Sequence, residues 1–144
     1  MINKIFVKRK ISLIQDDLAN FSHFAQYSFE EIAKDYIKQA ATERFLERVV
    51  NRAIDINQHL IAELATKDTS SPKTYTDTFI MLPDLGVYSK DFATEISKSV
   101  GTRNKLVHEY DKVDQKIIYD SIADCLRDYQ QYCGYILKFL EGMA

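Results

Sequence analysis

The sequence predicts an all-α protein, an antiparallel bundle of four to six helices. Of its 144 residues, only 4 are glycine and 2 are proline, the residues that hairpins and loops require most. Apolar residues recur along most of the chain at spacings of three and four, which is the period of an amphipathic helix. Alternating β-branched runs between turns, which indicate strands, are absent at any useful length.

The first two helices follow from this period. Apolar residues at Ile11, Ile14, Leu18 and Phe21 predict a helix over about the first 25 residues. Ser28, followed three residues later by a glutamate, forms a capping-box pattern that opens a second, long helix. One face of that helix reaches about residue 65 and is marked by Leu46, Val49, Ala53, Ile56, Leu60 and Leu64.

The second half of the chain predicts a loop and three further helices. Residues 66–74 are rich in serine and threonine, so we expect a loop, then a short helix to Met81. Ser89 opens the next helix, and Gly101 can close it as a left-handed residue. Asp114 can cap a last long helix, whose apolar face carries Ile118, Ile122, Cys125, Tyr129, Tyr132, Ile136 and Phe139.

Length, charge and hydropathy exclude several classes of protein. A chain of 144 residues favours a single domain over residues 1–144, with a core that needs no disulfide or zinc. The net charge of −2 is unlike that of a general nucleic-acid binder. Four basic residues near the start, Lys4, Lys8, Arg9 and Lys10, are better explained as a solvated helix face than as a binding patch. No run approaches the ~18 apolar residues of a membrane span, and we expect a cytoplasmic protein without a secretory leader.

Cys125 and Cys133 fall in one predicted helix, where a rise of ~12 Å separates them beyond disulfide reach. They are best interpreted as core thiols, since neither has a partner at zinc-ligand spacing. The remaining polar candidates also favour structural roles. Asp55 and His59 are most simply a surface pair one helical turn apart, and His23 is expected to be partly buried or at an interface. The nine tyrosines serve packing more often than base stacking.

The candidate for chemistry is "GTRNKLVHEYD", residues 101–111, with Arg103, His108 and Tyr110. A histidine moves protons near neutral pH and an arginine binds phosphate through two donors, so together they suit phosphoryl chemistry without a metal. In a regular helix, however, His108 would lie about 140° from Arg103. Three explanations stay open: an irregular helix near Gly101, long side chains that converge, or a second copy that completes the site. A cation that merely complements a helix end is the simpler alternative.

The stretch "RNKLVHEY" resembles the R-x4-H-x-Y signature of the HepT-type toxins within the HEPN (higher eukaryote and prokaryote nucleotide-binding) ribonuclease superfamily. Arg103, His108 and Tyr110 occupy the signature positions, and Asn104 follows the arginine as is usual there. Segments 43–63, 75–89 and 107–122 also resemble successive parts of that family. The resemblance covers roughly residues 40–140 and is loose before them.

The resemblance implies a HEPN-like fold and a metal-independent endoribonuclease that needs no cofactor, acts as a homodimer and usually cuts tRNA. His108 would accept the proton of a ribose 2′-hydroxyl, and Arg103 would stabilise the charge on the pentavalent phosphorus. The products would be a 2′,3′-cyclic phosphate and a 5′-hydroxyl, and DNA would not be cut. Asn104 would orient Arg103 or a phosphate.

The resemblance also implies a type VII-like toxin–antitoxin system, in which an MntA-type nucleotidyltransferase is the antitoxin. That partner would transfer AMP from ATP to the Tyr110 hydroxyl and so block the cleft. Two other hypotheses remain. The chain can be a non-catalytic subunit that binds a nucleotidyltransferase or its substrate, or a purely structural helical dimer.

Overall fold

The computed structural model describes the backbone of residues 1–108 and 115–143, and the side chains of all of these except Val107 and His108. Over this range the all-α prediction is confirmed: six α-helices and two short 3-10 helices are present, and no strand. The α-helices are α1 (Lys4–Phe21), α2 (Phe29–Ala33), α3 (Tyr36–Leu64), α4 (Tyr75–Ile80), α5 (Lys90–His108) and α6 (Gln115–Glu141). The 3-10 helices are Ser22–Gln26 and Leu82–Leu85.

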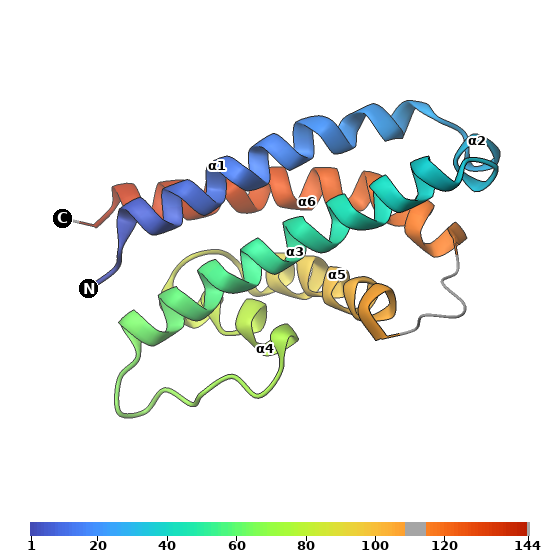
Figure 1. Cartoon of the computed structure of the whole chain (residues 1–144). Coiled ribbons are helices and arrows are strands. Elements are labelled where there is room, and N and C mark those ends of the chain that lie inside the picture. Colours follow the sequence, from blue (N-terminus) through green and yellow to red (C-terminus); the bar gives the residue numbers. More distant parts are fainter. Residues whose placement is uncertain (109–114, 144) are drawn as a thin grey trace.

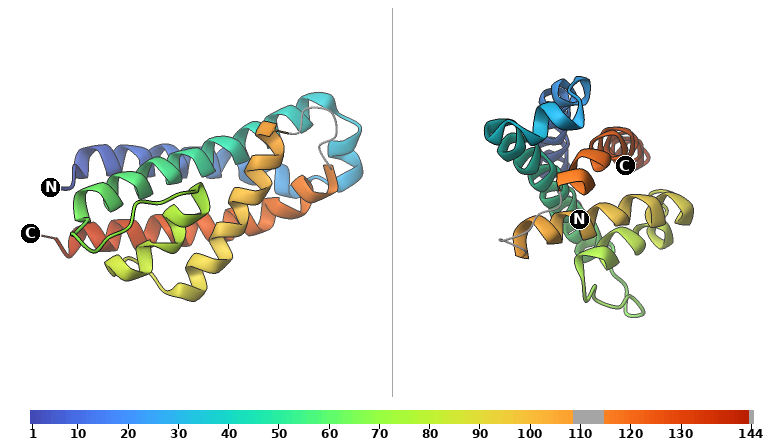
Figure 2. Two further views of the ribbon diagram at one scale, coloured as in Figure 1. Left: turned by 90° about the horizontal axis from the view of Figure 1, so that it is seen from below. Right: turned by 90° about the vertical axis from the view of Figure 1, so that its right-hand side faces the viewer.

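Three long helices form the body of the molecule. Helix α1 runs antiparallel to both α3 and α6, and the two chain ends lie at the same end of the bundle (Figure 1). Helix α5 crosses α3 and α6 obliquely, and the short α4 packs against α3 and α5 (Figure 2). The shared core includes Ile11, Leu46, Ile96 and Tyr132, each at most 1% exposed. The apolar period thus predicts which face each long helix buries.

The prediction of one long helix from residue 28 to about 65 is wrong in one respect, because this segment forms two helices. Ser28 and Glu31 do form the predicted capping box, but the helix they open, α2, ends at Ala33. Asp35 then adopts an extended backbone, and its carboxylate accepts hydrogen bonds from the amides of Ile37 and Lys38. This second N-cap starts α3 as a separate helix, because an Asp side chain competes for the backbone donors of the next turn.

The prediction for Gly101 is also wrong. Ser89 caps the amide of Phe92 as expected, but α5 continues through Gly101 to His108. A glycine inside a helix costs only about 1 kcal/mol. The core contacts of Val100 and Leu106, on either side of it, outweigh that cost. The left-handed glycine is instead Gly86, with φ of 84°, between the second 3-10 helix and α5.

Other predictions for this half of the chain are confirmed. Residues 66–74 form no helix, and α4 follows them with Thr74 and Asp77 as its capping box. Cys125 and Cys133 are buried in α6 as free thiols. Asp114, the predicted cap of the last helix, lies outside the described residues. In the range that the structure describes, no helix is both long and apolar enough to cross a bilayer.

The polar residues near the first helix mostly fasten it to α3. Asp55 pairs with Lys10 at 2.9 Å, and His59 Nε2 accepts the backbone N–H of Asn3 at 2.9 Å. Both residues therefore bind α1 rather than line a cleft. His23 is exposed, so the expectation that it is partly buried is wrong within this chain.

Candidate active site

Arg103 projects from α5 toward α3, and three neighbours hold its guanidinium. Nε donates to Asn51 Oδ1 at 2.8 Å, and Nη1 donates to Asn104 Oδ1 at 3.2 Å. Its Cζ atom also lies 5.1 Å from the ring centroid of Tyr75. A planar guanidinium held by two hydrogen bonds and one ring keeps a defined orientation, so little side-chain entropy remains to be lost when it binds a ligand.

The partners of Arg103 among the described residues are all uncharged. Among the described residues, no carboxylate lies within ion-pair distance of it, and its Nη2 has no hydrogen-bond partner. Four other arginines do pair with carboxylates: Arg44, Arg48, Arg52 and Arg127. Within the described part of the chain, Arg103 is therefore oriented by neutral groups and pairs with no carboxylate, which suits it to receive an anionic oxygen.

A buried chain of hydrogen bonds fixes Tyr75 beside Arg103. The Tyr132 hydroxyl donates to Asn57 Oδ1 at 2.6 Å, and Asn57 Nδ2 donates to Thr78 Oγ1 at 3.3 Å. Thr78 Oγ1 in turn donates to the backbone carbonyl of Tyr75 at 2.6 Å. Burial raises the pKa of the Tyr132 phenol well above its ordinary value, so this group stays a neutral donor. The chain ties α6, α3 and α4 together at the start of α4.

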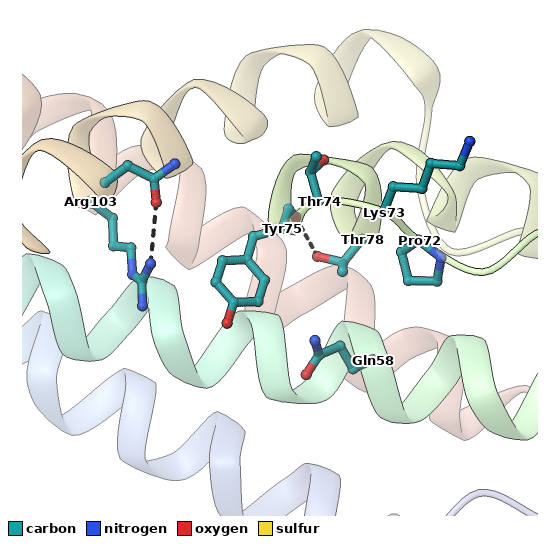
Figure 3. A pocket seen from close by; sticks show the side chains of 8 residues that line it. Gln58, Pro72, Lys73, Thr74, Tyr75, Thr78 and Arg103 are labelled. Atoms are coloured by element: carbon teal, nitrogen blue, oxygen red, sulfur yellow. Dashed lines mark hydrogen bonds between the residues drawn. The ribbon is translucent and has the colours of Figure 1, made fainter. Parts of the chain in front are cut away.

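A hollow of about 510 Å³ opens next to Arg103. Its lining includes Gln58, Lys73, Tyr75, Thr78, Arg103 and Asn104. Figure 3 shows the Tyr75 ring over α3 between the side chains of Arg103 and Gln58, with Lys73 at the opposite end from Arg103. The size of the hollow lies within the range of about 300–1,000 Å³ that small-molecule sites occupy.

The other predicted site residues are described only in part. His108 is the last residue of α5, and Tyr110 lies outside the described residues. Because α5 is continuous from Arg103 to His108, an irregular helix at Gly101 is excluded as the way to bring these two residues together. The angle of about 140° between their positions on the helix stands.

Asn51 and Tyr75 are the site residues that the sequence analysis missed. Asn51 is 52 residues away from Arg103 in the sequence, and Tyr75 is also distant from it. No local sequence pattern therefore reveals that either residue contacts Arg103. One signal was available. Asn51 interrupts the apolar run "VVNRA" inside a long helix, although asparagine is a poor former of helix interiors. A polar residue retained in such a place often has a specific partner.

Over the described range, no group of three or more His, Cys, Asp or Glu side chains is arranged to hold a metal ion. The amide oxygens of Asn51 and Asn104 accept hydrogen bonds from Arg103, so the donor groups that this site offers to an anion are those of the guanidinium itself.

The family model of ribonuclease HepT-like proteins matches residues 14–136. The chain belongs to this family. The match begins within α1, so it extends further toward the start of the chain than the resemblance seen in the sequence motifs.

Two curated relatives span nearly the whole chain. A tRNA nuclease HepT from Aphanizomenon flos-aquae is 31% identical over 96% of this chain and 92% of its own length. An mRNA nuclease HepT from Shewanella oneidensis is 27% identical over 94% of this chain and 95% of its own length. The HepT-like assignment thus covers the helices that carry Asn51, Tyr75 and Arg103.

Solved structures share the fold. The tri-AMPylated HEPN toxin of Shewanella oneidensis, in complex with an MNT antitoxin, superposes with a TM-score of 0.79 at 21% identity, over 92% of this chain and 97% of that one. YutE of Bacillus subtilis, a cytosolic protein of unknown function, superposes with a TM-score of 0.82 at 20% identity, over 97% and 92%. At these identities the superpositions show that the HEPN-type helical fold is the architecture of this chain.

Proposed function

We propose that this HepT-like chain is the toxin of a toxin–antitoxin pair and cuts tRNA as a metal-independent endoribonuclease. The observation that carries the proposal is the guanidinium of Arg103 beside an open hollow, where it is held by neutral groups and pairs with no carboxylate of a described residue. Of the two HepT relatives described above, the tRNA nuclease is the more similar to this chain.

The proposed reaction is an attack within the RNA itself. His108 accepts the proton of a ribose 2′-hydroxyl, and the 2′-oxygen forms a bond to the adjacent phosphorus. Arg103 donates hydrogen bonds to the phosphoryl oxygens as negative charge builds up on them. The bond to the 5′-oxygen breaks, and that oxygen takes up a proton. The products are a 2′,3′-cyclic phosphate and a 5′-hydroxyl, and no metal ion takes part.

A homodimer resolves the angle between the two residues on α5. One helix separates Arg103 and His108 by about 140°, so a single copy does not present both from one face. A two-fold axis near the end of α5 gathers both residues from both copies into one cleft. We therefore propose that the active form is a homodimer, which sedimentation equilibrium at micromolar concentration would detect. A monomer that cleaves at full rate would contradict it.

The decisive test incubates purified protein with unfractionated tRNA in excess EDTA. We expect cleavage that leaves 2′,3′-cyclic phosphate ends, and a loss of rate of about 10²-fold or more in His108→Ala and in Arg103→Ala. Circular dichroism confirms that both variants fold. Cleavage that stops in EDTA, or variants as active as the parent, would refute the mechanism. A protein that binds its partner but never cuts RNA would instead be the non-catalytic subunit.

We further propose that the cognate antitoxin is a nucleotidyltransferase that modifies Tyr110. Transfer of AMP to the phenol adds a phosphodiester charge that competes with the substrate for Arg103. Intact-mass spectrometry after incubation with the antitoxin, ATP and Mg²⁺ should show added AMP that maps to Tyr110. Tyr110→Phe should remain unmodified and toxic beside the antitoxin; neutralisation of this variant would show inhibition by binding alone.

A further inference from the structure

The hollow beside Arg103 has a cationic side chain at each end. Arg103 lies at one end and Lys73 at the other, with the Tyr75 ring between them (Figure 3). The Lys73 ammonium group makes no hydrogen bond or ion pair with a described residue, as the Nη2 group of Arg103 makes none. The order of cation, aromatic ring and cation is the order of groups that an RNA strand would need, since phosphates flank each of its bases.

The charge of this hollow differs from that of its neighbours. None of the residues that line it is acidic, although the whole chain carries a net charge of −2. The hollow on the other side of Lys73 is lined by Asp68, Asp77 and Asp84. A third, smaller hollow between α5 and α6 is lined by Glu95, Asp124 and Asp128. An anionic chain is therefore attracted to the first hollow more strongly than to the other two.

Asp77, two residues after Tyr75, is an acidic residue whose carboxylate is already hydrogen-bonded to the backbone. Its carboxylate accepts the backbone N–H groups of Lys73 and Thr74 at 2.9 and 3.2 Å. These bonds hold the backbone of Lys73 at the rim of the hollow. The Lys73 ammonium group lies at the end of the hollow that is farther from Arg103 (Figure 3).

Tyr75 offers a rigid surface for stacking. It is 43% exposed, yet its backbone is tied to the core through Thr78, Asn57 and Tyr132. One part of its ring contacts Arg103, and the remainder lines the hollow. An aromatic ring that is exposed and held in place binds a base at little cost in conformational entropy.

We propose that this hollow is a nucleotide-binding subsite, in which Tyr75 stacks on the base next to the scissile phosphate and Lys73 binds the following phosphate. The inference rests on the proposed ribonuclease function, because it takes the ligand to be RNA and Arg103 to bind the scissile phosphate. In this arrangement, α4 and the loop before it determine which nucleotide of the bound RNA lies next to Arg103.

The test measures binding separately from cleavage. Fluorescein-labelled unfractionated tRNA is titrated in EDTA at several salt concentrations with proteins that also carry His108→Ala, and the dissociation constant is read from anisotropy. Tyr75→Ala should weaken binding by about 5-fold or more, whereas Tyr75→Phe should stay within about 2-fold of the parent. Lys73→Ala should also weaken binding and reduce the slope of log K against log salt by about 0.7 to 0.9.

Matched controls separate the subsite from general effects. Ile80→Ala truncates a side chain of α4 that is also 43% exposed but lies outside the hollow. Lys67→Ala removes a charge from the same loop without touching the lining. Both should bind as the parent does. Tyr75→Ala should weaken binding further when Arg103→Ala is already present, because stacking is a contact of its own and not only support for the arginine.

The outcomes distinguish this inference from the proposed function. If Tyr75→Ala and Lys73→Ala bind like the parent while the protein with intact His108 cleaves tRNA, the subsite is wrong and the ribonuclease stands. If binding weakens as expected but no tRNA is cut, the subsite is supported and the catalytic proposal fails. A parent that neither binds nor cuts tRNA overturns both.

Discussion

Asn51 and Arg52 are neighbours on α3, yet they stabilise two very different arginine environments. Arg52 turns toward α1, where it pairs with the buried carboxylate of Asp17 and donates to the Leu13 carbonyl at 3.2 Å. Arg48 reaches the same carboxylate at 3.4 Å. Asn51 turns toward α5 and holds Arg103 through a neutral amide oxygen. On one face of α3, the Arg52 guanidinium is paired with a carboxylate. On another face, Asn51 holds the Arg103 guanidinium through a neutral group.

The difference shows that an arginine side chain can be held in a fixed orientation without its charge being neutralised. A carboxylate partner orients an arginine and also cancels the field that would attract an anion. An amide oxygen or an aromatic ring orients it and leaves most of that field in place. We therefore expect the α1–α3 contact to serve stability and the α3–α5 contact to serve the proposed ligand binding. Substitutions on the two faces of α3 should affect different measurements.

The largest effect is expected from replacing each arginine by lysine. Arg103→Lys keeps the charge but loses the Nε bond to Asn51 and the planar contact with Tyr75, so we expect cleavage to fall by about 10²-fold with little change in Tm. Arg52→Lys should leave the cleavage rate within about 2-fold and lower the Tm instead. Rates on tRNA and thermal melts check both; an equal loss of activity in the two variants would remove the distinction.

The next effect concerns stability alone. Asp17→Asn removes the negative partner of two arginines at a side chain that is 5% exposed, and we expect the free energy of unfolding to fall by about 2 kcal/mol. That loss corresponds to a decrease in Tm of about 6 °C for a chain of this size. Cleavage at 25 °C should be unchanged, since Asp17 belongs to α1 and contacts Arg48 and Arg52 of α3 rather than Arg103. Asp16→Asn, an exposed neighbour, is the control and should leave the Tm unaltered.

A charge placed opposite Arg103 sharpens the comparison further. Asn51→Asp gives Arg103 the kind of partner that Arg52 has, and we expect cleavage to fall by about 10-fold as the guanidinium becomes neutralised. The fold should be as stable as the parent or slightly more so. Asn51→Ala removes the hydrogen bond without adding charge and should retain more activity. If the alanine variant is the less active of the two, orientation matters more than available charge.

The smallest effect is a pH dependence at the start of α4. The backbone N–H of Lys73 is the main cause that lowers the pKa of Asp77 below its ordinary value of 3.8. A lowered pKa means that the ionised carboxylate stabilises the fold above about pH 4, and that this stabilisation is lost as pH falls through the folded-state pKa. The Tm difference between parent and Asp77→Asn should thus be present at pH 7 and shrink below pH 4.

The sequence predicted the helical architecture because burial repeats locally along each helix. The sequence-based prediction of helix boundaries failed where a single residue decided whether a helix ends or continues. Asp35 starts a new helix where the apolar period continues, and Gly101 stays helical because its neighbours pack well. Arg103 was found through a sequence motif, whereas Asn51 and Tyr75 were not, since their roles depend on tertiary contacts that no spacing encodes. The placement of Tyr110 and the role of His108 remain predictions.

The hydrogen-bonded path from Tyr132 through Asn57 and Thr78 to Tyr75 has a genetic consequence. A cell that carries an active growth-arresting protein gains from any substitution that disables it. Survivors of such a selection should include changes at Asn57 and Tyr132, which are 0% exposed and cannot touch RNA, because loosening them releases the helix that supports the cleft. The substitutions that abolish growth arrest would then include buried residues along this hydrogen-bonded path as well as residues at the surface of the hollow.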